Sequence, residues 1–250
     1  MNLLILGATG GTGRALVKQA LEQEHMVTAF ARDPSQVSIA HPNLRVVKGD
    51  ILEYNSVESA MRGQDAALSA LGVGVKAMPL IAIVIFCQVI ARLFHLLGPA
   101  GWLVRIGVPF LAILMLFRRK TTLSAGTKNI VRAMEKLGVK RFVCESSLGI
   151  GDSRGQLGFL YNYLLIPILL RNIFADKEVQ EKLIKESNLE WVIVRPGALT
   201  NGPRTGIYRS GFDASEKSIQ AKISREDVAD FMLKQLNTDV YLSKTPGVSY

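Results

Sequence analysis

Three glycines near the start of the chain have the spacing of a phosphate-binding turn. Residues 2–6 are almost purely apolar, as a strand buried on both faces should be, and apolar residues recur at helical spacing over 13–22. Between these segments stand Gly7, Gly10 and Gly13. In a dinucleotide-binding turn, the first glycine permits the tight turn, the second lets the backbone approach the diphosphate, and the third lets the helix pack against the strand. The backbone N–H groups that begin the helix then face the phosphates. The predicted cradle comprises Gly7, Thr9, Gly10, Gly11, Thr12 and Gly13.

The residues that follow the next two predicted strands bear on which dinucleotide is bound. NAD sites place a carboxylate about 20 residues after the glycines, against the ribose 2′-hydroxyl, whereas NADP sites place an arginine against the 2′-phosphate. Arg32 stands 19 residues after Gly13, which favours NADP(H) over NAD(H). The adjacent Asp33 argues against this preference, and Arg32 is alternatively a solvated charge. Two interpretations of Asp50 are equally open, a contact to the adenine edge and a helix or turn cap.

These residues need a scaffold in which strands alternate with helices, and the sequence has that pattern. Alternation implies a parallel sheet with helices on its faces, and 250 residues suffice for one domain with a sizeable core. We therefore expect an α/β, Rossmann-like, doubly wound parallel sheet in a single domain over 1–250. The expected strands are 2–6, 26–31, 44–47, 66–71, 140–145 and 190–195. The expected helices are 12–24, 55–62, 123–137, 174–187 and 224–236, the last with a capping box formed by Ser224 and Asp227.

An apolar insertion over about 75–120, after the fourth strand, interrupts this alternation. Its two apolar arms, roughly 79–97 and 102–117, flank the turn formed by residues 98–101, which predicts a helical hairpin. The second arm would be about 24 Å long as a helix, short of the roughly 30 Å hydrocarbon core of a bilayer. Arg92 in the first arm is costly at membrane depth. A shallow or in-plane membrane anchor is therefore favoured over two spans, and packing of the arms on each other or in an oligomer interface remains the alternative.

The net charge of +9 is concentrated in the same region of the chain. Between Ala66 and Met134 there are eight Lys and Arg residues and no Asp or Glu. Nucleic-acid sites are basic patches on polar surfaces, whereas a basic and strongly apolar segment suits an anionic membrane surface. We therefore expect no nucleic-acid partner. A membrane surface or a membrane-protein partner would bind through 78–117 and 157–174, and a homo-oligomer is a further possibility.

The sequence indicates neither a metal site nor a secretory leader. The three histidines lie in unrelated segments, and no Cys/His cluster has the spacing of metal ligands, so no metal site is expected. Met1 leads directly into the first predicted strand without a basic and apolar leader. We therefore expect a cytoplasmic protein that is peripherally associated with a membrane.

An ordered set of motifs resembles a known family. "GATGGTG", "ARD", "GDI", "SALG", "GTKNIVRAM", "CESSLG", "VIVRPGALT" and "ISREDVADFML" together resemble the atypical short-chain dehydrogenase/reductases, in particular the NAD(P)H-binding, NmrA-like and flavin-reductase-like (biliverdin reductase B-like) branch. The resemblance covers nearly the whole chain except the insertion and part of 152–175. It implies a Rossmann fold, NADPH binding, and hydride transfer to a flavin, quinone-like or tetrapyrrole acceptor.

The resemblance also implies roles for residues that follow the central strands. Leu71 and Gly72 would line the nicotinamide ribose, and the loop shaped by Pro196 and Gly197 would close over the nicotinamide. The candidate catalytic residues are Ser146, Ser147 and Lys177. The serines would hydrogen-bond the acceptor or the nicotinamide, or alternatively satisfy the local backbone. Lys177 would be a substitute proton donor or a ribose contact, or alternatively a solvated helix residue.

The chain departs from the wider superfamily in its proton-transfer pair. That superfamily uses Tyr-x-x-x-Lys, in which the lysine lowers the tyrosine pKa, but Leu165 and Pro167 stand four residues after Tyr161 and Tyr163. Alcohol dehydrogenation by that pair is therefore disfavoured. The sequence predicts an NADPH-dependent reductase of an apolar or planar small-molecule acceptor at a membrane surface. The alternative is a non-catalytic NADPH-binding redox sensor, or an assembly factor for a membrane-protein partner.

Overall fold

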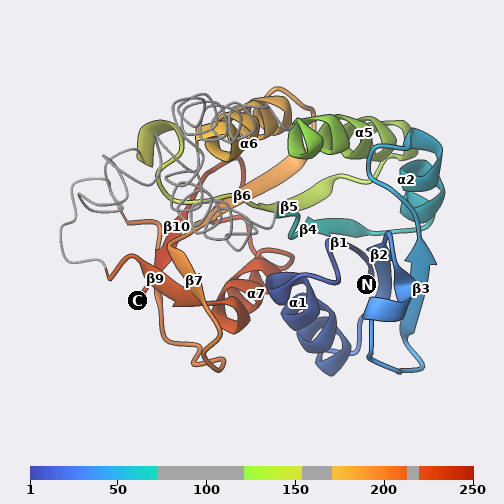
Figure 1. Ribbon diagram of the computed structural model, residues 1–250, viewed down its shortest axis with the longest axis horizontal. Helices are drawn as coiled ribbons and strands as arrows, with labels where there is room; N and C mark the ends of the chain where they lie inside the picture. The colour runs from blue at the N-terminus through green and yellow to red at the C-terminus, as the bar shows by residue number, and fades with distance from the viewer. Residues whose placement is uncertain (73–120, 154–170, 213–219) are drawn as a thin grey trace, which may run out of the picture. The chain divides into compact units, whose positions relative to one another are not determined.

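The computed structural model describes residues 1–72, 121–153, 171–212 and 220–250, and these ranges form one eight-stranded sheet covered by helices (Figure 1). The sheet contains β1 (Asn2–Leu6), β2 (Met26–Ala31), β3 (Leu44–Lys48), β4 (Ala66–Ser69), β5 (Arg141–Glu145), β6 (Glu190–Pro196), β8 (Arg209–Ser210) and β10 (Gly247–Ser249). The described helices are α1 (Gly11–Glu22), α2 (Tyr54–Met61), α5 (Thr122–Leu137), α6 (Arg171–Lys185) and α7 (Arg225–Lys234). A separate pair consists of β7 (Ala198–Thr200) and β9 (Lys222–Ser224).

The strand order is β3-β2-β1-β4-β5-β6-β10-β8, and every pairing is parallel except that between β10 and β8. After β1 the chain adds β2 and β3 on one side, and β4 then pairs with the other edge of β1. This reversal is a topological switch point, where open α/β sheets bind ligands beyond the carboxyl ends of their strands. The predicted α/β Rossmann-like fold is confirmed. The apolar insertion predicted over about 75–120 lies outside the described residues, as do residues 157–170 of the second apolar segment.

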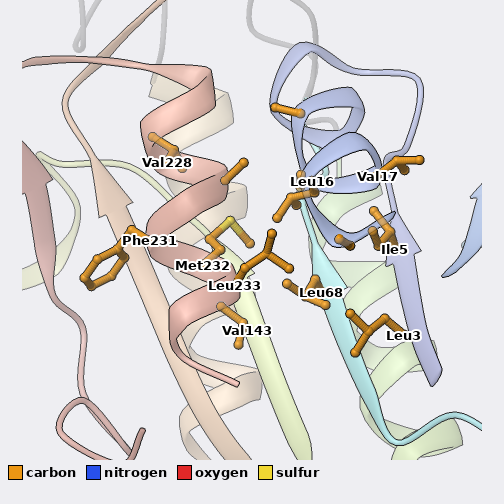
Figure 2. Packing of buried hydrophobic residues seen from close by; sticks show 14 of the residues in the cluster. Leu3, Ile5, Leu16, Val17, Leu68, Val143, Val228, Phe231, Met232 and Leu233 are labelled. Atoms are coloured by element: carbon orange, nitrogen blue, oxygen red, sulfur yellow. The ribbon is translucent and has the colours of Figure 1, made fainter. Parts of the chain in front are cut away.

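Helices cover both faces of the sheet, α1 and α7 on one face and α2, α5 and α6 on the other (Figure 1). Side chains alternate along β1, so that Leu3 and Ile5 pack toward α1 and α7 whereas Leu4 and Leu6 pack toward the opposite helices. Figure 2 shows the first of these cores, where Leu16 of α1 faces Met232 and Leu233 of α7, while Ile5 of β1 lies beneath α1. The central strands are buried on both faces, which explains their continuous apolar sequence.

The predicted elements match the described ones closely up to β6 and less well after it. The strand predicted over 66–71 ends at Ser69, and the helix predicted over 174–187 begins at Arg171. The short strands β7 to β10 were not predicted. Each has two or three residues, too few for an alternating pattern, and β10 is defined by its parallel pairing with the distant β6.

The capping prediction for the last helix is half correct. The Ser224 hydroxyl accepts a hydrogen bond from the Asp227 N–H (3.0 Å), so Ser224 caps α7. The reciprocal bond is missing because the Ser224 N–H donates to the Tyr250 hydroxyl (3.2 Å). The Asp227 carboxylate instead accepts hydrogen bonds from the loop that follows β7.

Candidate functional site

The glycine turn between β1 and α1 has a shape that side chains would obstruct. Gly7 has a φ of +81°, and a Cβ on it would lie 2.5 Å from the Ala70 carbonyl oxygen. A Cβ on Gly13 would overlap the Gly7 carbonyl, so α1 packs directly against the turn. Gly10 is the N-cap of α1, and within the described part of the chain no side chain caps this helix and no acidic residue occupies its first turn. The first N–H groups of α1 are thus oriented for an anion, and these residues fit a dinucleotide diphosphate.

The candidates for the adenosine end follow β2 and β3. Arg32 is exposed just beyond β2. The Asp33 carboxylate accepts hydrogen bonds from the Ser35 hydroxyl (2.7 Å), the Gln36 amide (2.9 Å) and the Ser35 N–H (3.2 Å), and these bonds lower its pKa. Asp33 therefore caps the short helix η1 (Pro34–Gln36). The Asp50 carboxylate accepts from the Leu52 N–H (3.0 Å), which corresponds to the turn cap of its two interpretations.

The other candidates lie at the carboxyl ends of three adjacent strands. Ser69 of β4 pairs with Cys144 of β5, and Glu145 pairs with Val194 of β6. The next residues continue side by side, since the Ser146 N–H donates to the Val194 carbonyl (2.7 Å). This arrangement brings the predicted nicotinamide-side residues to one edge of the sheet: Leu71, Gly72, Ser146, Ser147, Pro196 and Gly197.

The two candidate serines use their hydroxyl protons within the protein. The Ser146 Oγ donates to Glu181 Oε1 (2.7 Å), whereas the Ser147 Oγ donates to the Leu148 carbonyl (3.1 Å). In this arrangement the Ser146 hydroxyl can still accept a hydrogen bond from a bound molecule. Ser147 satisfies its local backbone, as one of its two interpretations proposed.

Glu181 is held by a buried arginine. Arg195 of β6 is 1% exposed and donates to both Glu181 oxygens, at 3.0 Å from Nε and 2.7 Å from a terminal nitrogen. A further bond joins Arg195 to Asp152. Burial alone would raise the pKa of Glu181, but hydrogen bonds from Arg195 and Ser146 hold it below its ordinary value. The Ser146 hydroxyl is therefore oriented by an ionised carboxylate.

Lys177 lies beneath the same edge and is 8% exposed, so its interpretation as a solvated helix residue is wrong. Its Nζ donates to the Ser146 carbonyl (3.0 Å), which ties α6 to the end of β5. An ammonium group has three donors, and this hydrogen bond uses one of them. The lysine is thus placed beside Ser146 with capacity for a further acceptor.

Sequence reasoning missed Glu145, the last residue of β5. Its side chain is 6% exposed and accepts a hydrogen bond from the Thr12 hydroxyl (3.1 Å) in the first turn of α1. Burial raises the pKa of Glu145, with Lys177, Thr12 and Arg225 acting in the opposite direction. The available signal was a carboxylate at the end of the otherwise apolar stretch "FVCE".

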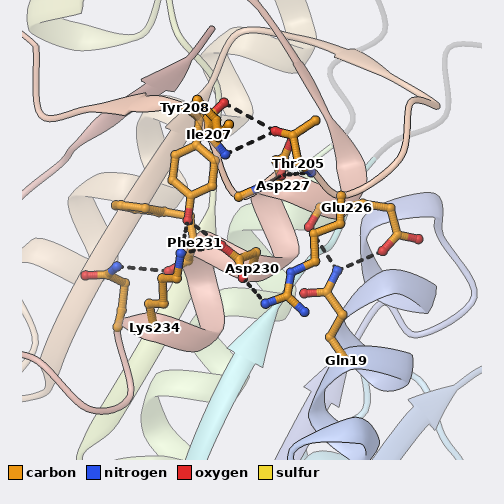
Figure 3. Close-up of polar contacts among 12 residues, drawn as sticks. Gln19, Thr205, Ile207, Tyr208, Glu226, Asp227, Asp230, Phe231 and Lys234 are labelled. Atoms are coloured by element: carbon orange, nitrogen blue, oxygen red, sulfur yellow. Dashed lines mark hydrogen bonds and ion pairs between the residues drawn. The ribbon is translucent and has the colours of Figure 1, made fainter.

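Helix α7 fixes the loop that follows β7 (Figure 3). The Asp227 carboxylate accepts from the Thr205 N–H, the Thr205 hydroxyl and the Gly206 N–H, each at 2.8 Å. Asp230 accepts from the Tyr208 hydroxyl (2.6 Å), and burial together with this bond raises the Tyr208 pKa. These bonds hold residues 205–208 against α7, beyond the Pro196–Gly197 turn.

None of the helices in the described ranges has an apolar stretch of the length that a membrane span requires. Both arms of the predicted hairpin lie outside those residues.

The sequence matches the model of a protein family described as NAD(P)H-binding over residues 7–239. It is 28% identical over 239 residues to an uncharacterized chloroplastic protein of Arabidopsis thaliana, covering 94% of this chain and 71% of that protein. It is 22% identical over 253 residues to the photosystem II assembly factor Ycf39 of Synechocystis, covering 98% of this chain and 61% of that protein.

Solved structures share the fold. An oxidoreductase from Lactococcus lactis superposes with a TM-score of 0.70 at 22% identity, covering 100% of this chain and 90% of its own. The Escherichia coli O157:H7 anaerobilin reductase ChuY superposes with a TM-score of 0.69 at 18% identity, covering 100% and 97%. A Veillonella parvula short-chain dehydrogenase/reductase in complex with NADP also gives 0.69, at 16% identity, covering 100% and 94%. At these identities the superpositions establish the Rossmann-like fold and nothing finer.

Proposed function

The chain belongs to the NAD(P)H-binding family, and from this premise we propose that it is an NADPH-dependent reductase of an apolar or planar acceptor of the flavin, quinone or tetrapyrrole type. The observation that carries the proposal is the glycine turn, where a Cβ at Gly7 or Gly13 would collide with backbone and α1 begins without a side-chain cap. Membership of an NAD(P)H-binding family supports redox chemistry at this edge of the sheet.

Residues already described would bind the diphosphate, the 2′-phosphate and the nicotinamide side of NADPH. The first turn of α1 would bind the diphosphate, and exposed Arg32 would bind the 2′-phosphate that distinguishes NADPH from NADH. Asp33 supports this preference, because its carboxylate is engaged by Ser35 and Gln36 rather than free for a ribose hydroxyl. The nicotinamide-side residues are Leu71, Gly72, Pro196 and Gly197.

The bound dinucleotide would supply a hydride, and the chain's own residues would orient the acceptor and supply a proton. Counting back four residues from Lys177 gives Ile173, so the tyrosine of a Tyr-x-x-x-Lys pair is missing in this register too. Lys177, whose Nζ contacts the Ser146 carbonyl, would then be the proton donor. An acceptor ring whose proton can come from solvent needs positioning more than a tyrosine, which favours a flavin-like or quinone-like ring over a carbonyl that is reduced to an alcohol.

We also propose a location for this activity. Residues 78–117 and 157–174 are apolar, and the first of these segments lies in the basic, carboxylate-free part of the chain. Because they follow strands whose carboxyl ends form the site, they would bring the acceptor pocket to an anionic membrane surface on the cytoplasmic side, or to a membrane-protein partner.

The test is an NADPH titration by fluorescence, followed by oxidation assays with FMN and a soluble quinone, with and without anionic liposomes. We expect turnover that rises with liposomes and falls to the liposome-free rate when 78–117 is deleted. Lys177→Met should lower turnover by at least about tenfold, since general acids contribute 10²–10⁴-fold. The matched control is Lys182→Met on the same helix, whose side chain is 72% exposed. Tight binding of NADPH without oxidation of any acceptor would contradict a reductase.

That last outcome would support a second function, a non-catalytic NADPH-binding sensor or assembly factor. The missing tyrosine favours it, and so does the similarity to Ycf39, a photosystem II assembly factor. In that case NADPH would change the affinity of the protein for a membrane-protein partner. Binding of NADPH is common to both functions, and turnover separates them.

A further inference from the structure

Arg225, the first residue of α7, lies across the start of α1. A Cβ added to Gly11, the first residue of α1, would lie 2.7 Å from the Arg225 Nε and closer still to its Cδ. Only a residue without a side chain allows the arginine this position. Gly11 therefore allows the N-termini of α1 and α7 to approach each other closely, in addition to its place in the turn.

The guanidinium of Arg225 is held by a neutral partner. A terminal nitrogen donates to the Asn201 Oδ1 (2.5 Å), which fixes the side chain through a neutral amide. Among the described residues no carboxylate lies within 4.0 Å of it, whereas Arg195 and Arg204 each pair with an aspartate or glutamate. The half-buried cation thus keeps most of its N–H donors for another anion.

A groove opens beside this arginine. It has a volume of about 400 Å³ and runs between α1 and the segment after β7. Its wall includes Gly11, Lys18, Asn201, Arg204, Arg225 and Glu226. The turn itself, "GATGGTG", contains no cation, so within it the charge on two phosphates would be met by neutral N–H and hydroxyl groups.

We propose that Arg225 is a cofactor-binding residue that donates to the diphosphate of the dinucleotide from the side of α7. The inference rests on the proposed function, because it assumes that the N-terminus of α1 binds a dinucleotide. A planar guanidinium can donate two parallel hydrogen bonds to phosphate oxygens. Arg225 would then act on the part shared by NADPH and NADH, whereas Arg32 would act on the 2′-phosphate alone.

The experiment measures dissociation constants of NADPH, NADH and adenosine 2′-monophosphate for the full chain and its variants. Arg225→Gln should weaken NADPH and NADH by the same factor, about tenfold or more, as expected when a hydrogen bond to a charged group is lost. It should leave adenosine 2′-monophosphate, which has no diphosphate, unchanged. Arg32→Gln should show the opposite pattern, weakening NADPH and adenosine 2′-monophosphate but not NADH.

Two further variants serve as controls for the effect of Arg225→Gln. Lys18→Gln removes a charge from the same groove wall, where the side chain is 62% exposed, and should bind both dinucleotides as the wild type does. Arg225→Lys retains the charge and should recover part of the affinity, and thermal unfolding verifies that each variant is folded. Equal affinities of Arg225→Gln and wild type for both dinucleotides would overturn the inference alone. A wild type that binds neither would overturn the proposed function and the inference with it.

Discussion

Replacing Glu181 by glutamine should cost more stability than any surface substitution on α6. Glu181 and Arg195 form a buried ion pair, in which both carboxylate oxygens accept from the guanidinium. The glutamine would keep the shape but lose the charge, and its NH2 group would face guanidinium donors. The other anionic partner of Arg195 is Asp152, whose side chain is 79% exposed and therefore a poor substitute.

The magnitude follows from this geometry. Breaking a buried pair by removing one partner typically costs 3–5 kcal/mol, and the remaining contact to Asp152 places our expectation near the lower limit, about 3 kcal/mol. For a chain of 250 residues, each kcal/mol shifts Tm by about 2–4 °C, so Tm should fall by about 6–12 °C. The stability from Glu181 should also depend on pH. Because its folded-state pKa is lowered, that stability is present above the ordinary value of 4.5 and is lost as pH falls through the folded-state value.

The assay is urea unfolding of wild type and variant at pH 7 and again at acidic pH. Glu186→Gln is the matched control, since Glu186 is a highly exposed partner of Lys182 and should change stability by less than about 0.5 kcal/mol. A loss below about 1 kcal/mol for Glu181→Gln, or a difference that grows at acidic pH, would refute the reasoning. The double variant Glu181→Leu with Arg195→Met should lose less than Glu181→Gln alone, because no unpaired charge remains buried.

Three other predictions concern the site. Gly13→Ala should abolish measurable NADPH binding in a fluorescence titration because its Cβ would overlap the Gly7 carbonyl, and an affinity within about twofold of wild type would contradict this. Glu145→Gln should become progressively more stable than wild type as pH rises from about 4.5, because burial raises the folded-state pKa of Glu145; a pH-independent difference in unfolding free energy would count against this. Asp227→Asn should lower the free energy of unfolding by about 2 kcal/mol at pH 7. The loss should shrink in acid, because the hydrogen bonds to Asp227 lower its pKa against the effect of burial. Equal protease sensitivity of the 205–208 loop in both proteins would contradict the conclusion that Asp227 holds this loop.

The parts of the site that sequence predicts are local in the chain. The strand, turn and helix of the cradle follow from periodicity and three glycines within 22 residues, and the structure places them as expected. The ends of β4, β5 and β6 also come together as a parallel sheet requires. A pattern with a period of two or 3.6 carries this information without knowledge of distant partners.

The residues that were missed are defined by contacts between distant positions. The bond from Thr12 to Glu145 joins residues 133 apart, and that from Gln19 to Glu226 joins residues 207 apart. The strand predicted over 190–195 includes Arg195, but its apolar pattern does not indicate that Arg195 is buried, because that burial depends on the contact with Glu181 of the preceding helix. Side-chain pairing across elements has no period, so single-sequence patterns do not detect it.

Helix α6 explains why Lys177 has a defined position even though the helix lacks a broad apolar face. Asp176 caps α5 by accepting from the Leu123 N–H (2.9 Å) and the Ser124 N–H (3.1 Å), and Gln180 donates to the Thr127 hydroxyl (2.9 Å). Lys177 and Glu181 also make buried polar contacts, so four buried residues of α6 in turn are held by hydrogen bonds. Apolar burial is non-directional, whereas each of these hydrogen bonds weakens as its distance and angle depart from the preferred values. A helix fixed in this way holds an ammonium group beside Ser146 more closely than an apolar interface of the same area would, which is the property a proton donor or a ribose contact requires.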